Sequence, residues 1–289
     1  MALSRTFLFA PGNHARRVEK SLTLGADAVI LDLEDAVANS EKIATRAVAV
    51  AALQAPRRCR GYIRVNAMST DWGYGDMVAV ARAGVDGIML PKVESADELK
   101  TADWLLGALE REHGLPPGAI DLLPIVETAR GFVNLGAIAA AGTRVRRIAF
   151  GAGDFTFDLG ITWSAEETEL LPYRSQFVAQ SRAAGLEPPI DTVWVRLQDE
   201  EGFRRSATHV KALGFQGKLC IYPTQVPVVN GIFAPTEEEL AWARRVLAAF
   251  DEAEAKGLAS IQIDGRFIDY PFAHLARRML EQGALAAAS

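Results

Sequence analysis

The sequence predicts a (β/α)8 barrel, in which eight parallel strands alternate with helices. Eight short apolar runs recur along the 289 residues, and most end in a charged residue or a Gly/Pro turn. Successive runs start between 22 residues (6 to 28) and 43 residues (147 to 190) apart, so each interval can hold the crossover helix that parallel pairing requires. The runs are rich in Val, Ile and Leu, as expected for strands buried on both faces. They cover residues 6–12, 28–35, 62–66, 87–92, 122–127, 147–154, 190–195 and 218–223.

Helix signals lie between and after these runs. Residues 14–24 follow a Pro-Gly-Asn turn, and residues 95–112 and 236–254 each open with Ser or Thr three positions before Glu, the spacing of a capping box. The eighth run and its helix complete a barrel domain over residues 1–233. Residues 234–289 exceed what a barrel needs, and we predict a C-terminal helical extension that contacts a neighbouring subunit.

Composition excludes several classes of protein. Hydrophobic residues make up 49% and charged residues 23% of the chain, as in ordinary globular proteins. The net charge of −5 and the lack of a Lys/Arg block argue against nucleic-acid binding. Two cysteines are too few for a disulfide framework and fit a reducing compartment. Without a signal-peptide pattern or an apolar run of membrane length, we expect a cytoplasmic protein.

Carboxylates gather where the predicted strands end, which is where barrel enzymes place their chemistry. Asp32 and Glu34 are two residues apart at the end of the second strand and therefore share a face. Glu127 ends the fifth strand, and the same parity puts Asp154 with Ala152 on one face of the sixth. Each carboxylate alone would also suit a helix cap or an ion pair. Because two adjacent desolvated carboxylates are costly, Glu127 and Asp154 together favour a cation such as Mg²⁺ between them.

Two basic residues accompany the carboxylates. An arginine inside a barrel strand is costly unless it meets an anion, and the planar fork of Arg64 suits a carboxylate or a thioester enolate. The alternative is an internal ion pair with Asp32 or Glu34. Lys92, at the end of the fourth strand, invites comparison with Schiff-base lysines. The surrounding carboxylates favour a structural or electrostatic role instead.

The loop at residues 11–13 leads into a helix that carries Arg16 and Lys20. These side chains are four residues apart and share a face near the helix N-terminus, where backbone N–H groups also favour phosphate. They form either a small basic patch for a phosphorylated tail or a solvated helix face. The four histidines lack metal-ligand spacing, and we assign them no role.

Seven motifs follow one another along nearly the whole chain. They are FLFAPGN (7–13), GADAVILDLEDAV (25–37), IRVN (63–66), LPKVES (90–95), VETARG (126–131), FGAGDF (150–155) and GKLCIYPTQ (217–225). In this order they resemble the CitE-like branch of the HpcH/HpaI aldolase family, which includes the citrate lyase beta subunit, malyl-CoA lyase and citramalyl-CoA lyase. Tyr222, Gly153 and Arg196 differ from residues common in that family, and none of the three is an implied metal ligand.

The resemblance implies a magnesium-dependent carbon–carbon lyase. Such an enzyme cleaves a 3-hydroxyacyl-CoA thioester of the malyl or citramalyl type to an acyl-CoA and a 2-keto acid. By resemblance, Glu127 and Asp154 hold Mg²⁺, and Arg64 contacts the substrate and steadies its developing negative charge. Asp32 and Glu34 then orient metal-bound water from behind the ligands.

The resemblance also assigns the remaining site residues. It places the coenzyme A moiety at Phe9, Arg16 and Lys20, and it makes Asp269 an acid/base group that reaches into a neighbouring subunit. A homo-oligomer, either a trimer or a hexamer, follows from this. Three alternatives stay open: a citrate lyase beta subunit acting on a citryl thioester on an acyl carrier protein, a pyruvate-type aldolase, and a non-catalytic thioester-binding protein.

Overall fold

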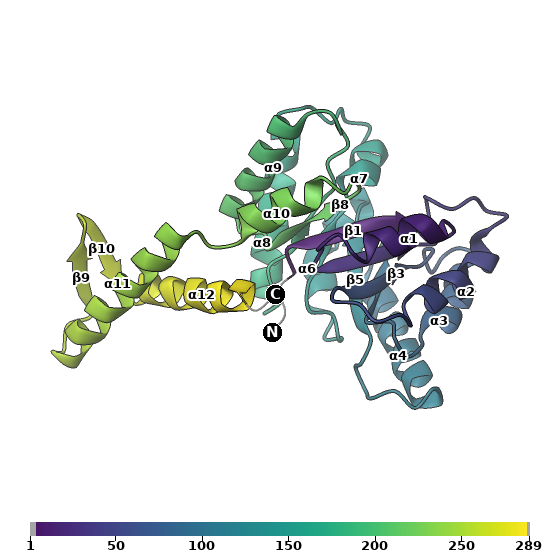
Figure 1. The fold of residues 1–289 in the computed structure, drawn as a ribbon, viewed down its shortest axis with the longest axis horizontal. Helices are drawn as coiled ribbons and strands as arrows, with labels where there is room; N and C mark the ends of the chain where they lie inside the picture. The colour runs from purple at the N-terminus through teal and green to yellow at the C-terminus, as the bar shows by residue number, and fades with distance from the viewer. Residues whose placement is uncertain (1–3, 288–289) are drawn as a thin grey trace. The chain divides into compact units, whose positions relative to one another are not determined.

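The chain folds into a closed eight-stranded parallel barrel followed by a smaller C-terminal unit. The computed structural model describes residues 4–287, which divide into two compact units at residues 230/231, close to the boundary suggested at 233/234. In the first unit each strand pairs with the next, and β8 closes on β1 (Figure 1). The predicted (β/α)8 fold is confirmed. None of the helices within residues 4–287 has both the length and the apolar character needed to cross a membrane.

The barrel elements alternate as predicted, although several strands are shorter than the apolar runs. The strands are β1 Thr6–Pro11, β2 Ala28–Asp32, β3 Arg60–Arg64, β4 Gly87–Leu90, β5 Asp121–Val126, β6 Ala149–Phe150, β7 Ile190–Asp191 and β8 Gly217–Cys220. The helices are α1 Ala15–Ser21, α2 Lys42–Ala52, α3 Gly73–Val80, α4 Ala96–Glu112, α5 Ala129–Val133, α6 Leu135–Ala139, α7 Ala152–Leu159, α8 Leu171–Ala183, α9 Glu200–Leu213 and α10 Gln225–Phe233, with a 3-10 turn at Thr168–Leu170.

The sixth strand differs most from its prediction. It ends at Phe150, and α7 begins two residues later at Ala152. Asp154 therefore lies in the first turn of a helix, and the parity that put it on a strand face with Ala152 was wrong. The Ala152 N–H donates to Thr192 Oγ1 (2.9 Å), which draws the chain out of the sheet. A carboxylate is also favourable in the first turn, at the positive end of the helix dipole.

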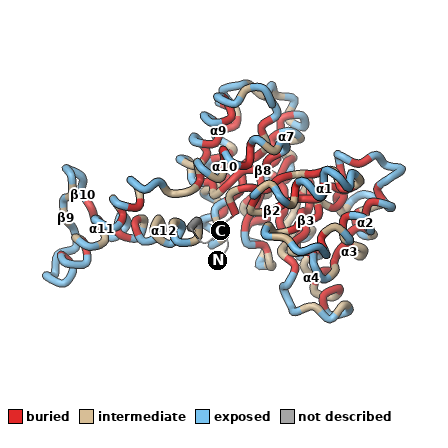
Figure 2. The backbone as a smooth tube through the Cα atoms, viewed as in Figure 1, coloured by how far each residue is buried: buried red, intermediate tan, exposed pale blue. Residues whose placement is uncertain are grey.

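The barrel interior is filled by side chains from all eight strands. Figure 2 shows buried residues along the strands and a mixture of buried and exposed residues along the outer helices. Phe7 and Tyr62 meet edge to face inside, with ring centroids 5.5 Å apart. Ile125 and Leu219 belong to this core and also face the cavity described below, so the core forms the floor of that cavity.

A buried charge network ties α8 to β7 and β8. Arg174 and Asp191 are both fully buried, and Arg174 donates to both Asp191 carboxylate oxygens (2.8 and 3.0 Å) and to Glu167 (2.9 Å). Lys218, also fully buried, pairs with Asp191. Burial would raise the pKa of Asp191, but Arg174 and Lys218 outweigh burial and lower it. The two cations and two carboxylates balance, so the network is complete as it stands.

Replacing Arg174 with methionine should therefore destabilise the barrel. Glu167 and Asp191 would keep only Lys218 as a buried cation, and breaking such a network typically costs about 3–5 kcal/mol. Urea unfolding measures this cost. The matched control is Arg204→Met, which breaks an exposed pair with Glu200 and should change stability by less than about 0.5 kcal/mol. An equal effect of the two substitutions would contradict the prediction.

The second unit combines two helices with a β-hairpin. Its elements are α11 Glu237–Ala255, β9 Ser260–Ile263, β10 Arg266–Asp269 and α12 Tyr270–Ala287. The capping boxes predicted at the starts of α4 and α11 are both present. The extension is not wholly helical, however, because β9 and β10 pair across a two-residue turn at Asp264 and Gly265. Both turn residues have positive φ (51° and 75°), the conformation that Asp-Gly favours in tight hairpins.

Candidate active site

A cavity of about 460 Å³ opens at the C-terminal ends of the barrel strands. All residues that line it belong to the first unit. Its apolar floor and its charged groups come from seven of the eight strand ends. The lining residues are Phe9, Ala10, Pro11, Asp32, Asp35, Ala36, Arg64, Ile125, Glu127, Gly151, Gly153, Asp154, Thr192, Val193, Leu219 and Ile221. Apart from Asp269, Arg16, Lys20 and Glu34, every site residue expected from the sequence lines this cavity.

Glu127 is a strongly perturbed carboxylate of the site. It follows β5 directly and is only 4% exposed. One oxygen, Oε1, accepts a hydrogen bond from the Lys92 backbone N–H (2.9 Å). Burial, reinforced by the charges of Glu34 and Asp154 and only partly offset by Arg64, raises the pKa of Glu127 to about 8. A bound cation would remove this penalty, so the group is suited to a metal.

Arg64, the last residue of β3, is held rigidly at the wall of the cavity. Its Nε and Nη2 atoms donate to the two oxygens of Asp32 (2.7 and 2.6 Å), and Nη1 lies 3.0 Å from Glu34 Oε2. Its guanidinium also lies over the Phe9 ring, 4.9 Å from the centroid. Burial would raise the pKa of Asp32, but Arg64 lowers it. The internal ion pair left open by the sequence is therefore present, in a residue that also faces the cavity.

Lys92 links three carboxylates at the rim. Its backbone is in the left-handed region (φ 53°), which is rare for residues other than glycine, asparagine and aspartate. Its ammonium lies 2.5 Å from Glu34 Oε1 and 3.6 Å from both Asp35 and Asp154. Burial favours the neutral amine, but the hydrogen bond to Glu34 and the neighbouring charges raise the pKa of Lys92 instead. A protonated amine is not a nucleophile, so this geometry favours the electrostatic role over Schiff-base chemistry.

Glu127 and Asp154 form a donor set that fits a hard divalent cation. Both line the cavity, one buried and one with 40% of its side chain exposed. Within residues 4–287 no three His, Cys, Asp or Glu side chains form a ready-made metal cage. Mg²⁺ is typically held by one or two protein carboxylates and completes its shell with water and ligand oxygens. The residues present therefore suit Mg²⁺ better than a metal that requires a full protein cage.

Of the four other predicted residues, only one lines the cavity. Phe9 lines the cavity, whereas Arg16 and Lys20 are exposed side chains of α1. Asp269 ends β10 in the second unit, and its Oδ1 is buried without a hydrogen-bond partner among the described residues. The roles of all four stay predictions. Glu34 does not line the cavity, but it contacts Arg64, which does, and Lys92, whose ammonium lies 3.6 Å from the cavity residues Asp35 and Asp154.

Two residues of the site were missed in the sequence. Thr192 is buried, lines the cavity and anchors the first turn of α7 through the Ala152 N–H. Asp35 lines the cavity and lies 3.6 Å from both Arg64 and Lys92. Their positions next to predicted strand ends were the only available signal.

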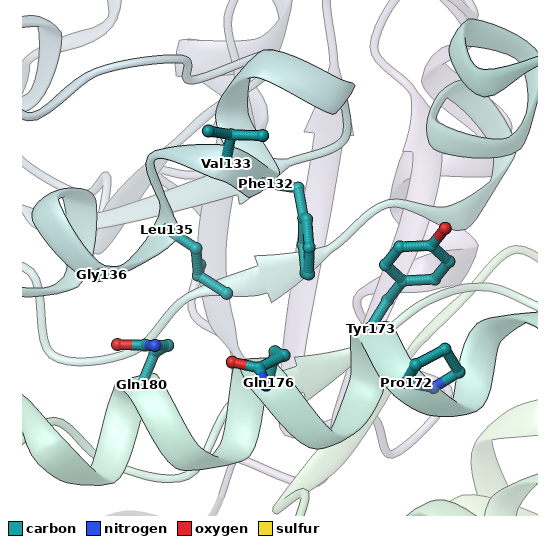
Figure 3. Close-up of a pocket in the computed structure, with 8 residues that line it drawn as sticks. All are labelled: Phe132, Val133, Leu135, Gly136, Pro172, Tyr173, Gln176 and Gln180. Atoms are coloured by element: carbon teal, nitrogen blue, oxygen red, sulfur yellow. The ribbon is translucent and has the colours of Figure 1, made fainter.

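A second cavity, of about 390 Å³, lies between α5, α6 and α8 on the outside of the barrel. Figure 3 shows Phe132 and Leu135 pointing toward α8, which contributes Pro172, Tyr173, Gln176 and Gln180. Its lining includes no carboxylate, lysine, arginine or histidine. The charged cavity at the strand ends is therefore the candidate active site.

Gly151 lines the cavity beside Glu127. A Cβ at this position would lie 2.3 Å from Glu127 Oε2 and 2.7 Å from Glu127 Cβ. We therefore expect Gly151→Ala to displace the Glu127 carboxylate and to weaken Mg²⁺ binding by at least about tenfold, as measured by titration calorimetry. The control is Gly153→Ala, where a Cβ meets nothing within 4 Å. Equal Mg²⁺ affinity in the two variants would refute the steric argument.

Comparison with known proteins gives a consistent group of relatives. A profile of the HpcH/HpaI aldolase/citrate lyase family matches residues 5–223. The citrate lyase subunit beta of Escherichia coli (strain K12) is 37% identical over 283 residues, covering 97% of this chain and 93% of that protein. The (3S)-malyl-CoA thioesterase of Cereibacter sphaeroides (strain ATCC 17029 / ATH 2.4.9) is 34% identical over 286 residues, covering 98% and 96%.

A solved structure agrees over almost the full length. The crystal structure of CitE from Mycobacterium tuberculosis, in complex with magnesium, acetoacetate and coenzyme A, superposes with a TM-score of 0.78. The two sequences are 32% identical, and the match covers 98% of this chain and 99% of that chain.

Proposed function

The chain belongs to the HpcH/HpaI aldolase/citrate lyase family and is a lyase, and from this membership and the cavity we propose a magnesium-dependent cleavage of 3-hydroxyacyl-CoA thioesters. The substrate is of the malyl or citramalyl type, and the products are an acyl-CoA and a 2-keto acid. The observation that carries the proposal is the buried Glu127. Its side chain lines one cavity together with Asp154 and Arg64, and its pKa is raised. The magnesium and coenzyme A of the M. tuberculosis relative support it.

The residues of the cavity divide the chemistry among them. Glu127 and Asp154 would hold Mg²⁺, which would supply Lewis-acid stabilisation and help to orient the substrate. Arg64 stabilises the negative charge that develops on the thioester oxygen, because its guanidinium is fixed in advance by Asp32. Glu34 pairs with both Arg64 and Lys92 and so helps to fix the position of the Arg64 guanidinium. The apolar floor excludes water from the carbon that becomes the enolate.

A proton must leave the 3-hydroxyl group and return to carbon. As the bond between C2 and C3 breaks, its electron pair forms the thioester enolate, and the hydroxyl oxygen becomes the keto oxygen. We assign the proton to Asp269 of a neighbouring subunit, which takes it from the hydroxyl and delivers it to the enolate carbon. This role requires a homo-oligomer such as a trimer or hexamer, in which Asp269, the last residue of β10, would reach the site of the next subunit. Phe9, Arg16 and Lys20 contact the coenzyme A moiety.

The direct experiment measures keto acid and free thiol released from malyl-, citramalyl-, methylmalyl- and citryl-CoA, and from a carrier-bound citryl thioester, with Mg²⁺ or EDTA. Keto acid without free thiol indicates the lyase. Free thiol formed together with the hydroxy acid would indicate hydrolysis, the activity named for the C. sphaeroides relative, and is the second candidate. Turnover only of a carrier-bound citryl thioester would indicate a citrate lyase beta subunit. No turnover of any thioester would leave a non-catalytic binding protein and overturn the proposal.

The shared site can be tested by subunit mixing. Asp269→Asn and Glu127→Gln should each be inactive alone, because each lacks one half of the site. Co-assembled subunits should recover a readily measured fraction of wild-type turnover, since some sites then combine an intact Glu127 with an intact Asp269 from the other subunit. Turnover no higher than that of the separate variants would exclude a site shared between subunits.

A further inference from the structure

A buried lysine outside the cavity lies directly behind the turn that carries Glu34. Lys42 is the first residue of α2 and is only 4% exposed. Its ammonium donates to the backbone carbonyls of Leu33 (3.1 Å) and Glu34 (2.7 Å) and to Asn66 Oδ1 (2.7 Å). An ammonium has three protons, so all of its donors are used.

The partners of Lys42 are themselves fixed. Asn66 is 2% exposed, and its Nδ2 donates to Asp76 Oδ2 (2.6 Å) and to the Leu33 carbonyl (3.1 Å). The fully buried Asp76 also accepts from Arg46 Nε (2.7 Å). The ammonium further lies over the Trp72 ring, 5.3 Å from its centroid. The network therefore positions the ammonium from several sides, and the ammonium in turn holds two consecutive carbonyls.

The turn held by Lys42 needs such support because the sheet contributes little there: the Leu33 N–H still donates to the Arg64 carbonyl (2.9 Å), but the Glu34 N–H has no backbone partner among the described residues. β2 ends at Asp32, and β2–β3 strand pairing ends with it at Arg64. Beyond this point, the Glu34 N–H donates to Asp32 Oδ1 (2.9 Å), while the Glu34 carbonyl accepts from Lys42. The side chain of Glu34 then reaches Arg64 on one side and Lys92 on the other.

We propose that Lys42 is a positioning residue: by holding the Leu33 and Glu34 carbonyls, it aims the Glu34 carboxylate between Arg64 and Lys92. The inference rests on the proposed function for its catalytic consequence. Its structural part, the fixed turn, does not depend on the reaction. Losing one partner of such a supporting contact typically lowers activity or metal affinity by about 10- to 100-fold.

The decisive experiment is a double-mutant cycle of Lys42→Met and Glu34→Gln on the full-length enzyme. Each single variant should lower kcat about 10- to 100-fold with a smaller change in KM. If Lys42 acts through Glu34, the double variant should be no slower than the slower single variant. Independent, multiplied losses, or wild-type kcat in Lys42→Met, would overturn the proposal. Should Lys42→Met fail to fold, Lys42→Gln, which keeps one amide donor, replaces it in the cycle.

Hydrogen exchange tests whether Lys42 fixes the turn, without measuring turnover. Amides of residues 33–37 should exchange faster in Lys42→Met than in wild type. The matched control is Arg144→Met, which removes the partly exposed partner of the buried Glu110 before β6, at the opposite end of the barrel. It should leave both kcat and these amides unchanged. If wild type cleaves no thioester, the proposed function fails, and exchange alone decides: faster exchange in Lys42→Met supports the fixed turn, and unchanged exchange overturns it.

Discussion

Glu127→Gln should abolish magnesium-dependent turnover while making the metal-free protein more stable. Glutamine cannot supply the negative charge that holds Mg²⁺, and Lewis-acid stabilisation is worth several kcal/mol, so kcat should fall by at least about 1000-fold. Direct Mg²⁺ titration should show the matching loss of binding. Turnover within tenfold of wild type would show that Glu127 is not a metal ligand.

The gain in stability follows from the raised pKa of Glu127. In the unfolded chain this group titrates near 4.5, whereas in the folded, metal-free protein its pKa is about 8. Between these values the folded state binds more protons, so the unfolding free energy of wild type falls as pH rises and levels off above about pH 8. Glu127→Gln should lack this contribution, and saturating Mg²⁺ should remove it from wild type.

The control for Glu127 is another buried carboxylate with the opposite shift. Glu110 is 1% exposed and faces Arg144. Burial would raise its pKa, but the hydrogen bond from Arg144 and two backbone N–H groups lower it. Glu110→Gln should therefore reduce stability at neutral pH and leave kcat unchanged. Urea unfolding between pH 5 and 9 in EDTA distinguishes the expected gain in stability of Glu127→Gln from the expected loss in Glu110→Gln.

Arg64→Met should lower kcat by about 100- to 1000-fold, the usual range for removing a group that stabilises an oxyanion. It should also cost stability, because Asp32 loses its bidentate partner. Arg64→Lys separates the two effects. Lysine restores a positive charge beside Asp32 but not the planar fork, so it should recover much of the stability and little of the turnover. Near-wild-type kcat in Arg64→Lys would show that charge alone suffices, and near-wild-type kcat in Arg64→Met would exclude Arg64 from the reaction.

Much of this site could be predicted because parallel strands repeat a simple pattern. The apolar runs placed Asp32, Arg64 and Glu127 at strand ends, and their carboxyl ends meet at one face of any such barrel. Two-residue parity put Asp32 and Glu34 on one strand face, but β2 ends at Asp32 and Glu34 lies in the turn beyond it. Both carboxylates nevertheless reach Arg64.

The rest of the site depends on contacts between distant residues, which a local sequence pattern does not predict. Asp154 was assigned to a strand because residues 147–154 read as one apolar run, yet the chain leaves the sheet at Gly151 to begin α7. Thr192, which anchors that departure, is 40 residues away in sequence. The hairpin before Asp269 did have a local signal, the Asp264-Gly265 pair between alternating residues, and it was overlooked.

The left-handed backbone conformation of Lys92 restricts which residues position 92 can accept. A residue other than glycine pays about 1 kcal/mol for this conformation, so a substitution to Gly or Asn would relax the chain. Either would delete the ammonium that contacts Glu34, Asp35 and Asp154. Arginine would keep a charge, but it would place a larger, planar group among them. No other residue at position 92 therefore keeps both the conformation and the ammonium. A saturation library of position 92, screened for turnover, should return lysine almost alone.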